Sequence, residues 1–473
     1  MILVVSILVL IGCEASSQTT EGPTDTTPSP TINFSNVDLY LTKSDESELF
    51  QHHKNSVPNY SENINFSIKV DPEITYQEID GFGFALTGGS ALHLSNMTSS
   101  KRAELLLELF SVNTIGISYL RISIGASDLD AEPFTYNDLS NGETDWNLDK
   151  FSLEKDQENL IPMLKEILEI NPEIKILGSP WSAPSWMKTN NSPINGSLKP
   201  ECYAVYADYF VKFIEGYEAE GITIDAITIQ NEPKHGGNNP SMYMESQDQA
   251  DFIKRSLGPA FETSNIQTKI IVWDHNADEY KYPISIFEDA EASKYVDGSA
   301  FHLYGGSIDD LSIVHNAYPD KNLYFTEQWV GVFSDFKYNL VWHTTELIVG
   351  ATRNWCKNVL EWNLVSNSEL EPHTPGGCTQ CLGGITIDGD LVKRNAGYYI
   401  IAHASKFVRP GSFRISSSKS TDLPNVAFKT PKGEMVVIVV NNTEINKSFN
   451  ILVSDEPVTA SLDAGSVGTY VWK

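Results

Sequence analysis

The stretch Thr228-Ile229-Gln230-Asn231-Glu232-Pro233 decides how this chain is interpreted. An apolar, β-rich run ends there in an asparagine, a glutamate and a proline. Polar side chains at the end of a buried strand are costly unless they have partners or a function. In a barrel of alternating strands and helices, functional side chains lie where the strands end at one face. The stretch therefore predicts a barrel strand that delivers Asn231 and Glu232 to a site.

The same kind of run recurs along the chain. The eight candidate strands are residues 79–84, 119–124, 174–179, 226–230, 269–273, 298–303, 322–326 and 359–364. Helical stretches separate them. Residues 154–170 carry apolar side chains at a 3.6-residue period, and residues 101–110 do so after Thr98-Ser99-Ser100, which predicts a capped helix. Eight such alternations over roughly 330 residues predict a (β/α)8 barrel.

The pattern changes after Phe407, where Arg409-Pro410-Gly411 ends the last helix. Short alternating strands follow at residues 426–429, 435–440, 448–452 and 468–472, with turn signals between them. This pattern predicts a small β-sandwich. The domain prediction is a signal peptide at 1–13, a disordered tether rich in Ser, Thr and Pro at 14–31, an N-terminal segment that adds strands to the sandwich at 32–75, the barrel at 76–407 and the sandwich at 408–473.

Composition limits the classes of partner. The 473 residues carry 33 Lys and Arg against 62 Asp and Glu, a formal net charge of −29. Such an acidic surface repels phosphate backbones, so no nucleic acid partner is expected. The charge suits either action on a neutral polymer or plain solubility. We expect a monomer that needs no cofactor and no metal.

The N-terminal end resembles an export signal. Residues 1–11 are almost purely apolar and lead into Gly12-Cys13, and about 20 residues would be needed to span a bilayer. Leu10-Ile11-Gly12-Cys13 resembles a bacterial lipobox, in which Cys13 is lipidated, although Ile11 is large and no basic residue precedes the run. An ordinary signal peptide is the alternative. We expect a chain anchored to the bacterial outer membrane, at its periplasmic face or at the cell surface, or a secreted one.

Four cysteines lie in the body of the chain, at positions 202, 356, 378 and 381. Cys378-Thr379-Gln380-Cys381 is a lone pair in a glycine-rich loop. Zinc would need a second pair or nearby histidines, and neither is evident. Export to an oxidising compartment favours a Cys378–Cys381 disulfide, with a redox role as the alternative.

A second carboxylate follows another apolar run, in Tyr324-Phe325-Thr326-Glu327-Gln328-Trp329. Two carboxylates at opposed strand ends are the arrangement that hydrolyses glycosides. Glu232 would be the general acid and base, and Glu327 the nucleophile. Retention requires carboxyl groups about 5–5.5 Å apart, against about 6.5–9.5 Å for inversion. The structural alternatives are a helix-capping Glu232 and a Glu327 paired with arginine.

Other strand ends carry polar or aromatic side chains as well. The candidate substrate-binding residues are Arg121, Asp128, Trp181, Asn231, His302, Tyr304 and Trp362. Arg121 would keep Glu327 ionised and Tyr304 would bond to it, while Asp128 and Asn231 would bind sugar hydroxyls. Trp181 and Trp362 would form sugar platforms. Structural roles remain open for Asp128 as a loop cap, for His302 as a satisfied core histidine and for both tryptophans as core residues.

These segments together resemble glycoside hydrolase family 30, which contains glucosylceramidases and β-1,6-glucanases. The matching segments are Asp80-Gly81-Phe82-Gly83-Phe84, Tyr119-Leu120-Arg121-Ile122, Ser179-Pro180-Trp181-Ser182-Ala183-Pro184-Ser185-Trp186-Met187-Lys188-Thr189, Gln230-Asn231-Glu232-Pro233, Phe301-His302-Leu303-Tyr304, Phe325-Thr326-Glu327-Gln328 and His403-Ala404-Ser405-Lys406-Phe407-Val408-Arg409-Pro410-Gly411-Ser412. The resemblance covers about residues 35–473. It implies a barrel joined to a β-sandwich, the roles given above for Glu232 and Glu327, and a bacterial member of the family.

The resemblance also implies a substrate class. Residues 83–89, Gly-Phe-Ala-Leu-Thr-Gly-Gly, depart from the glucosylceramidase sequence near the first strand, and the loop at 376–381 resembles microbial glucanases. We expect a retaining β-glycosidase that hydrolyses a β-glucan, with β-1,6-glucan as the best assignment, by double displacement. The alternatives are a glucosylceramidase-type exo-β-glucosidase, an exo- or endo-enzyme on xylan, fucoside or galactan, and a non-catalytic carbohydrate-binding surface lipoprotein.

Overall fold

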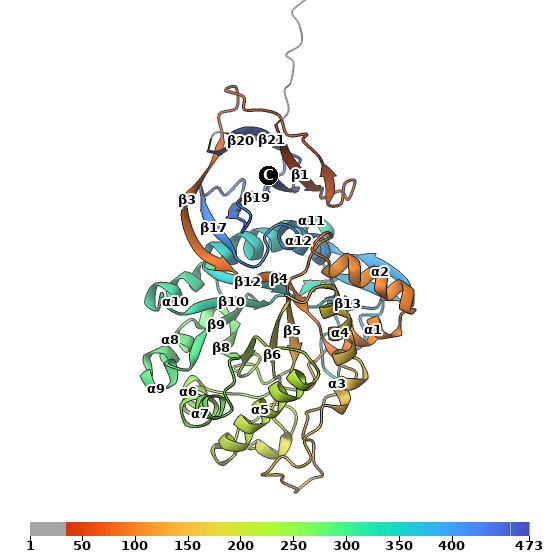
Figure 1. Ribbon diagram of the computed structural model, residues 1–473, viewed down its shortest axis with the longest axis vertical. Helices are drawn as coiled ribbons and strands as arrows, with labels where there is room; N and C mark the ends of the chain where they lie inside the picture. The colour runs from red at the N-terminus through yellow and green to blue at the C-terminus, as the bar shows by residue number, and fades with distance from the viewer. Residues whose placement is uncertain (1–34, 455, 473) are drawn as a thin grey trace, which may run out of the picture. The chain divides into compact units, whose positions relative to one another are not determined.

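The computed structural model describes residues 35–454 and 456–472. The expected signal, its Cys13 and the tether lie outside these residues. The described chain folds into a closed eight-stranded barrel and a β-sandwich (Figure 1), so the predicted fold is confirmed. Within the described ranges, no helix is both long enough and apolar enough to cross a membrane.

The barrel closes in the order β10-β12-β4-β5-β6-β7-β8-β9 through parallel pairs. Its strands are β4 (Gly81–Ala85), β5 (Tyr119–Ser123), β6 (Lys175–Ser179), β7 (Ala226–Thr228), β8 (Lys269–Asn276), β9 (Val296–His302), β10 (Asn322–Glu327) and β12 (Cys356–Glu361). All eight overlap the predicted runs. Strand β7 ends at Thr228, so the residues that lead to Glu232 are loop rather than strand.

Helices cover the outside of the barrel. They are α1 (Gly88–Asn96), α2 (Ser99–Phe110), α3 (Glu154–Glu158), α4 (Leu160–Ile170), α5 (Tyr203–Ala219), α6 (Ser246–Phe252), α7 (Gly258–Thr263), α8 (Lys281–Glu288), α9 (Ala290–Ser293), α10 (Leu311–Ala317), α11 (Phe336–His343) and α12 (Ala396–Ser405). Short 3-10 turns occur at η1 (Ser185–Met187), η2 (Pro200–Cys202), η4 (Ala277–Glu279) and η5 (Ile308–Asp310), and π-helical segments at η3 (Ile253–Leu257) and η6 (Thr344–Ala351).

Two helix predictions need correction. The single helix expected over residues 154–170 is two helices, because Asn159 leaves helical geometry at φ −138° and ψ −50° between α3 and α4. Thr98 stands at the N-cap of α2, but its side chain makes no capping bond. Its hydroxyl donates to Asp390 Oδ2 at 2.9 Å instead. The helix start is correctly placed, while the capping contact is replaced by a bond to a distant loop.

Barrel strands approach closely at glycines. A Cβ on Gly83 would lie 1.8 Å from the carbonyl oxygen of Tyr119, and a Cβ on Gly298 would lie 1.9 Å from that of Asn322. Neither position can therefore carry a side chain. Seven strands each give one buried apolar side chain to a layer that fills the barrel. The layer consists of Tyr119, Leu177, Ala226, Ile271, Ala300, Tyr324 and Leu360.

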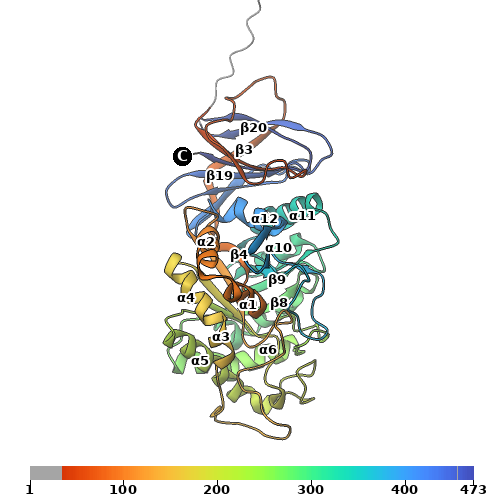
Figure 2. The same ribbon diagram turned by 90° about the vertical axis from the view of Figure 1, so that its right-hand side faces the viewer.

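The sandwich is one nine-stranded sheet in the order β2-β1-β22-β19-β18-β17-β3-β20-β21. Its strands are β1 (Val37–Thr42), β2 (Gln51–His53), β3 (Ser67–Ile79), β17 (Ser412–Ser417), β18 (Asn425–Lys429), β19 (Met435–Val440), β20 (Lys447–Val453), β21 (Val458–Leu462) and β22 (Val467–Trp472). Figures 1 and 2 show β20 and β19 in opposite layers, with both ends of the described chain in this sheet. An apolar cluster that includes Val437 and Ile451 fills the space between the layers.

Strands β17 and β21 were missed by the sequence prediction. In β17 the pattern is inverted, because Arg414 is buried while Phe413 is 42% exposed. The Arg414 guanidinium lies 3.6 Å from the ring centre of Tyr76, so a charged side chain occupies an inward position through a cation–π contact. Short strands also line the loops of the barrel, namely β11 (Val330–Gly331), β13 (Val365–Ser366), β14 (Cys381–Leu382), β15 (Ile385–Asp388) and β16 (Leu391–Arg394).

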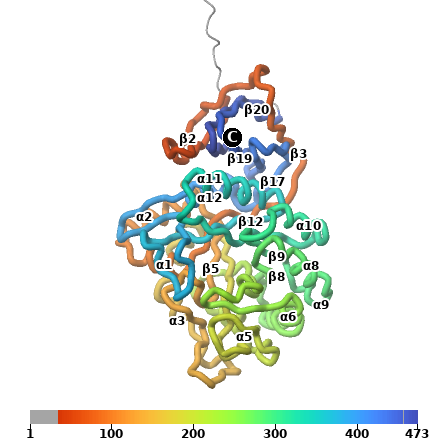
Figure 3. The backbone as a smooth tube through the Cα atoms, turned by 180° about the vertical axis from the view of Figure 1, so that it is seen from behind, coloured from red at the N-terminus to blue at the C-terminus, as the bar shows by residue number. Residues whose placement is uncertain are grey.

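His403 joins the last barrel helix to the sandwich. Helix α12 lies next to the sandwich strands when the protein is seen from behind (Figure 3). His403 is fully buried, and its ring nitrogens lie 2.8 Å from the hydroxyls of Thr469 and Thr42. Burial lowers the pKa of His403 to about 3. The neutral imidazole is therefore the form that the folded protein keeps.

This buried histidine predicts a loss of stability in acid. Below pH 6.5 the unfolded chain binds a proton at His403, whereas the folded protein does not until about pH 3, so the free energy of unfolding decreases as the pH falls. Between pH 7 and pH 5 the decrease from this residue is about 2 kcal/mol. Urea unfolding of the wild type and of His403→Gln at both pH values measures it as the difference between their pH dependences. Equal pH dependence in the two proteins would contradict the assignment.

Candidate active site

The site begins one pleat above the apolar layer of the barrel. Side chains two residues apart on a strand point to the same face. Two residues after the apolar layer, five strands place a polar side chain in the barrel interior, and the loop start after β12 places an aromatic one. These residues are Arg121 on β5, Ser179 on β6, Thr228 on β7, His302 on β9, Thr326 on β10 and Trp362 after β12. The parallel strands therefore stack a polar layer on an apolar one.

Strand β8 departs from this count. Asp274 comes three residues after Ile271, not two, and it still joins the polar layer. Trp273 and Asp274 have positive φ values of 72° and 66°, and the pairing with β9 shifts between Trp273 and His275. This bulge turns Asp274 into the barrel and Trp273 toward Tyr282 of helix α8, where the ring centres lie 4.4 Å apart.

Asp274 is the functional residue that the sequence analysis missed. It is fully buried, and three hydroxyls, from Ser179, Thr228 and Thr326, donate to its carboxylate at 2.5–2.6 Å. Burial alone would raise its pKa, but the positive charge of Arg121 and the bond to His302 hold the pKa of Asp274 well below its usual range. A carboxylate after an apolar run, the signal used for Glu327, was also present here.

Arg121 connects this buried carboxylate to Glu327. Its Nη1 donates to Glu327 Oε2 at 2.5 Å, and its Nη2 donates to Asp274 Oδ2 at 2.8 Å and to Asn231 Oδ1 at 2.7 Å. The guanidinium carbon lies 4.8 Å from the ring centre of Trp181. One buried cation thus faces two carboxylates, an amide oxygen and an aromatic face.

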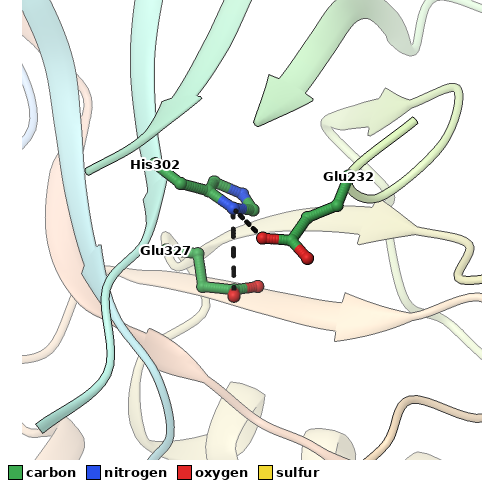
Figure 4. Close-up of side chains that lie close together, drawn as sticks. All are labelled: Glu232, His302 and Glu327. Atoms are coloured by element: carbon green, nitrogen blue, oxygen red, sulfur yellow. Dashed lines mark hydrogen bonds and ion pairs between the residues drawn. The ribbon is translucent and has the colours of Figure 1, made fainter. Parts of the chain in front are cut away.

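Glu232 and Glu327 face each other across His302 (Figure 4). A carboxylate oxygen of each, together with a ring nitrogen of His302, lie within 4.8 Å of one another. His302 Nδ1 is 3.3 Å from Glu232 Oε1 and 3.9 Å from Glu327 Oε1, while its Nε2 is 3.1 Å from Asp274 Oδ1. The Tyr304 hydroxyl donates to Glu327 Oε1 at 3.0 Å.

The charges of this group are coupled through His302. Burial works against its charged form, but the negative charge of Glu327 and the bonds to Asp274 and Glu232 raise the pKa of His302 to about 9. Burial raises the pKa of Glu232, but the hydrogen bond and charge of His302, together with the charges of His275 and His235, bring that pKa below its usual value. Burial also raises the pKa of Glu327, against the charges of His302 and Arg121. These directions favour a protonated His302 whose Nδ1 donates to Glu232 Oε1 at 3.3 Å.

A cavity of about 310 Å³ opens above the two glutamates. It is lined by Asp128, Trp181, Glu232, His235, Asn238, His275, Asn276, Tyr304, Glu327, Trp329, Trp362, Cys378 and Cys381. Trp181 and Trp362 form one wall with their rings stacked at 5.3 Å between centres. Of the predicted binding residues, Asp128, Trp181, Tyr304 and Trp362 thus reach the cavity.

The other predicted residues lie beneath the cavity surface. Arg121 and His302 are fully buried and Asn231 is 4% exposed. Arg121 bonds to Glu327, His302 to Glu232, and Asn231 to Arg121. The side-chain Nδ2 of Asn231 donates no hydrogen bond to any residue that the structure describes. The structure joins Cys378 and Cys381 by a disulfide, while Cys202 and Cys356 are free and buried.

Several lining residues were not among the residues predicted from the sequence. They are His235, Asn238, His275, Asn276 and Trp329. His235 and Asn238 follow the Asn-Glu-Pro turn, and Asn238 Nδ2 lies 3.4 Å from Glu232 Oε2. His275 and Asn276 follow Asp274 on the bulged strand. Proximity in sequence to the strand ends of Glu232 and Asp274 was the signal that could have found them.

A metal ion could in principle be held by Glu232, His302 and Glu327, because each of the three offers one ligand atom and these atoms lie close together. The Arg121 guanidinium already occupies Glu327 Oε2, and Asp274 takes the second nitrogen of His302. A permanent cation in direct contact with one ligand opposes the binding of another. The arrangement suits an acid–base pair better than a metal centre.

Comparison with known families decides the classification. The family model described as the glycosyl hydrolase family 30 TIM-barrel domain matches residues 79–408, and that of the family 30 beta sandwich domain matches residues 411–470. The chain belongs to glycoside hydrolase family 30. The enzyme class expected from the two glutamates is thereby confirmed: the protein is a glycoside hydrolase.

Relatives of the hydrolase cover most of its length. An endo-1,6-beta-D-glucanase of Neurospora crassa is 33% identical over 406 residues, which is 82% of this chain and 84% of that protein. The lysosomal acid glucosylceramidase of Mus musculus is 30% identical over 86% of this chain and 83% of its own length. A solved endo-beta1,6-glucanase is 37% identical with a TM-score of 0.85, covering 93% of this chain and all of that one.

The buried aspartate of the hydrolase gives a direct prediction. In Asp274→Asn the amide nitrogen faces hydrogen-bond donors, and Arg121 loses one of its two carboxylates, so we expect a destabilisation of about 3 kcal/mol. The displaced Arg121 and His302 should lower kcat/KM by about 100-fold. Chemical unfolding and steady-state kinetics measure the two effects.

Asp297→Asn is the matched control for this substitution. Asp297 is half-buried near the start of β9, at the opposite end of the barrel, where it accepts the Tyr324 hydroxyl at 2.6 Å. Its replacement should leave kcat/KM unchanged. Wild-type kcat/KM in Asp274→Asn would show that Asp274 does not position the site.

Proposed function

We propose that this hydrolase cleaves β-1,6-glucan with retention of configuration, with Glu327 as nucleophile and Glu232 as acid and base. The observation that carries the proposal is the approach of the two carboxylates to within 4.8 Å under a cavity. This separation fits the shorter spacing of about 5–5.5 Å of retaining enzymes rather than the 6.5–9.5 Å of inverting ones.

In the first step Glu327 Oε1 attacks the anomeric carbon. Arg121, bonded to Oε2, keeps the carboxylate ionised and fixes its orientation. The bond from the anomeric carbon to the glycosidic oxygen breaks as that oxygen takes a proton from Glu232. Glu232 receives this proton in turn from His302, whose Nδ1 lies 3.3 Å from Glu232 Oε1. Asn231 Nδ2 is available to bond the sugar 2-hydroxyl as charge develops on the ring.

In the second step the charges are exchanged. Glu327 is now esterified and neutral, and Glu232 is a carboxylate that can act as a base. It takes a proton from water while the hydroxide forms the bond to the anomeric carbon and Glu327 leaves as a carboxylate. The Glu232–His302 pair regains its proton, so the site returns to its starting state.

The relatives support the choice of substrate. The Neurospora protein and the solved structure are both named as endo-1,6-β-glucanases, and they cover more than four fifths of this chain. The mouse relative, at 30% identity, keeps glucosylceramide as the second candidate. Both are β-glucosides, so one glycone pocket would serve either, and the aglycone side decides between them.

We expect the wild type to release a ladder of oligosaccharides from β-1,6-glucan and to leave β-1,3-glucan, xylan and glucosylceramide intact. Glu327→Gln should abolish turnover. Glu232→Gln should lower kcat on β-1,6-glucan by roughly a thousandfold, the contribution of a positioned acid, but spare aryl glucosides whose leaving group needs no proton. Chromatography of products and steady-state kinetics measure these effects.

Controls separate the chemistry from the fold. Azide should rescue Glu327→Gly and give a glycosyl azide of inverted configuration, because a small anion replaces the missing nucleophile. Glu369→Gln, an exposed glutamate in the loop after β13, should retain wild-type activity. Near-native activity of both Glu327→Gln and Glu232→Gln would overturn the assignment of the two catalytic residues. Release of ceramide from glucosylceramide without cleavage of glucan would show that the substrate is glucosylceramide and not β-1,6-glucan.

We also propose that the enzyme is exported by a bacterium and lipidated at Cys13, as a monomer at the outer membrane. The apolar residues 1–11 followed by Gly12-Cys13 support this proposal. Expressed in a bacterial host, the wild type should incorporate labelled palmitate, and Cys13→Ser should not. Label that persists in Cys13→Ser, or none in the wild type, contradicts lipidation and leaves secretion.

A further inference from the structure

The loop between β13 and β14 reaches into the catalytic cavity through its disulfide. Cys378 and Cys381 both line the cavity, and they pack in an apolar cluster with Trp181, Trp362 and Leu129. The proposed reaction uses neither sulfur. The question is therefore what the disulfide-closed loop does at the cavity wall.

The loop holds Asp128 by its backbone and by its side chain. The Thr374 amide donates to the Asp128 carbonyl oxygen at 2.9 Å, and the Cys378 amide donates to Asp128 Oδ2 at 3.2 Å. Gly377 approaches so closely that a Cβ there would lie 2.4 Å from the same carbonyl oxygen. Among the described residues other than Asp128 itself, Cys378 provides the hydrogen-bond donor to the Asp128 carboxylate, through its backbone amide.

The loop is also fixed to the segments that carry both glutamates. The Thr374 hydroxyl donates to the Asn239 carbonyl oxygen at 2.5 Å, seven residues after Glu232. Cys381 opens β14, which pairs with β11 through Cys381↔Gly331, four residues after Glu327. The disulfide links two parts of the loop covalently. Cys378, whose amide donates to Asp128, is bonded to Cys381, which lies next to the segment that follows Glu327.

We propose that the Cys378–Cys381 disulfide is a positioning element that holds the Asp128 carboxylate against the sugar in the glycone pocket. The inference rests on the proposed glycosidase function and deepens it. Without the disulfide, the Cys378 amide is no longer fixed relative to Glu327, and Asp128 loses its defined distance from the reacting centre. Binding of the glycone then weakens, while the Glu327–Arg121 and Glu232–His302 contacts remain.

The test is a cycle of three proteins against the wild type: Cys378→Ala/Cys381→Ala, Asp128→Asn and the triple variant. We expect KM for β-1,6-gluco-oligosaccharides to rise about tenfold in each of the first two, the loss of one hydrogen bond to a charged group, with kcat nearly unchanged. The triple variant should be no worse than Asp128→Asn alone, because both changes remove the same contact.

Equilibrium binding of a gluco-configured iminosugar, measured by calorimetry, should show the same pattern of Kd values. This measurement does not depend on turnover, so it tests whether the disulfide positions Asp128 even if the proposed hydrolysis of glucan fails. KM effects that multiply in the triple variant, a fall in kcat at constant KM, or an unchanged Kd in the cysteine variant would each overturn the proposal.

Reduction of the folded wild type guards against a variant that fails to fold. A dithiol reduces the disulfide to two thiols and is itself oxidised to a cyclic disulfide. It should raise the Kd for the iminosugar about tenfold in the wild type and leave the double cysteine variant unchanged. Cys202 and Cys356 are present in both proteins, so any effect of the dithiol on these two thiols is the same in the wild type and in the double cysteine variant. A wild type that is reduced, folded and unchanged in Kd would also overturn the proposal.

Discussion

A single buried guanidinium holds the catalytic end of this barrel together. Arg121 is fully buried, and its charge is balanced by Glu327 on one side and Asp274 on the other. Such a cluster is expensive to bury unless every member has a partner. The apolar layer beneath it keeps water out from below, which strengthens each contact. Arg121 thus opposes the rise that burial causes in the pKa of Glu327 and orients its carboxylate, although Arg121 itself does not line the cavity.

The rest of the site follows from the pleat of the strands. Neighbouring strands are staggered in the closed barrel, so that Tyr119 pairs with Lys175 and Ile271 with Gly298, and the apolar layer is nevertheless formed by one residue from each of seven strands. Two positions further along, side chains of the same strands meet again at one level, which brings together Arg121, Ser179, Thr228, His302 and Thr326. Asp274 is the exception, and the bulge in β8 that places it requires two residues with positive φ. Backbone strain at this point is balanced by the three hydroxyls and the cation that the carboxylate receives.

The strands and the two glutamates could be predicted because a buried parallel strand is a continuous apolar run, and a carboxylate at its end stands out. Asp274 also follows an apolar run, but strict alternation from Ile271 would turn its side chain outward, and only the bulge in β8 turns it into the barrel. The replaced cap at Thr98 depends on Asp390, a residue far away in the sequence. The same holds for Asp128, whose donor at Cys378 is 250 residues distant, so no local pattern could reveal the contact.

Chemistry and selectivity are therefore carried by different parts of the chain. Arg121, His302, Asp274 and Glu327 sit on strands whose positions are fixed by the barrel. Asp128 sits on a loop that is held by another loop. Under the proposed roles, a change in the second loop would alter how the glycone is bound without moving Glu327 or Glu232. Relatives about 30% identical to this chain are named for a glucan and for a ceramide glycoside while matching it over most of their length. Because both substrates are β-glucosides, a difference between them would have to arise in loops on the aglycone side of the cavity, and the barrel strands could stay the same.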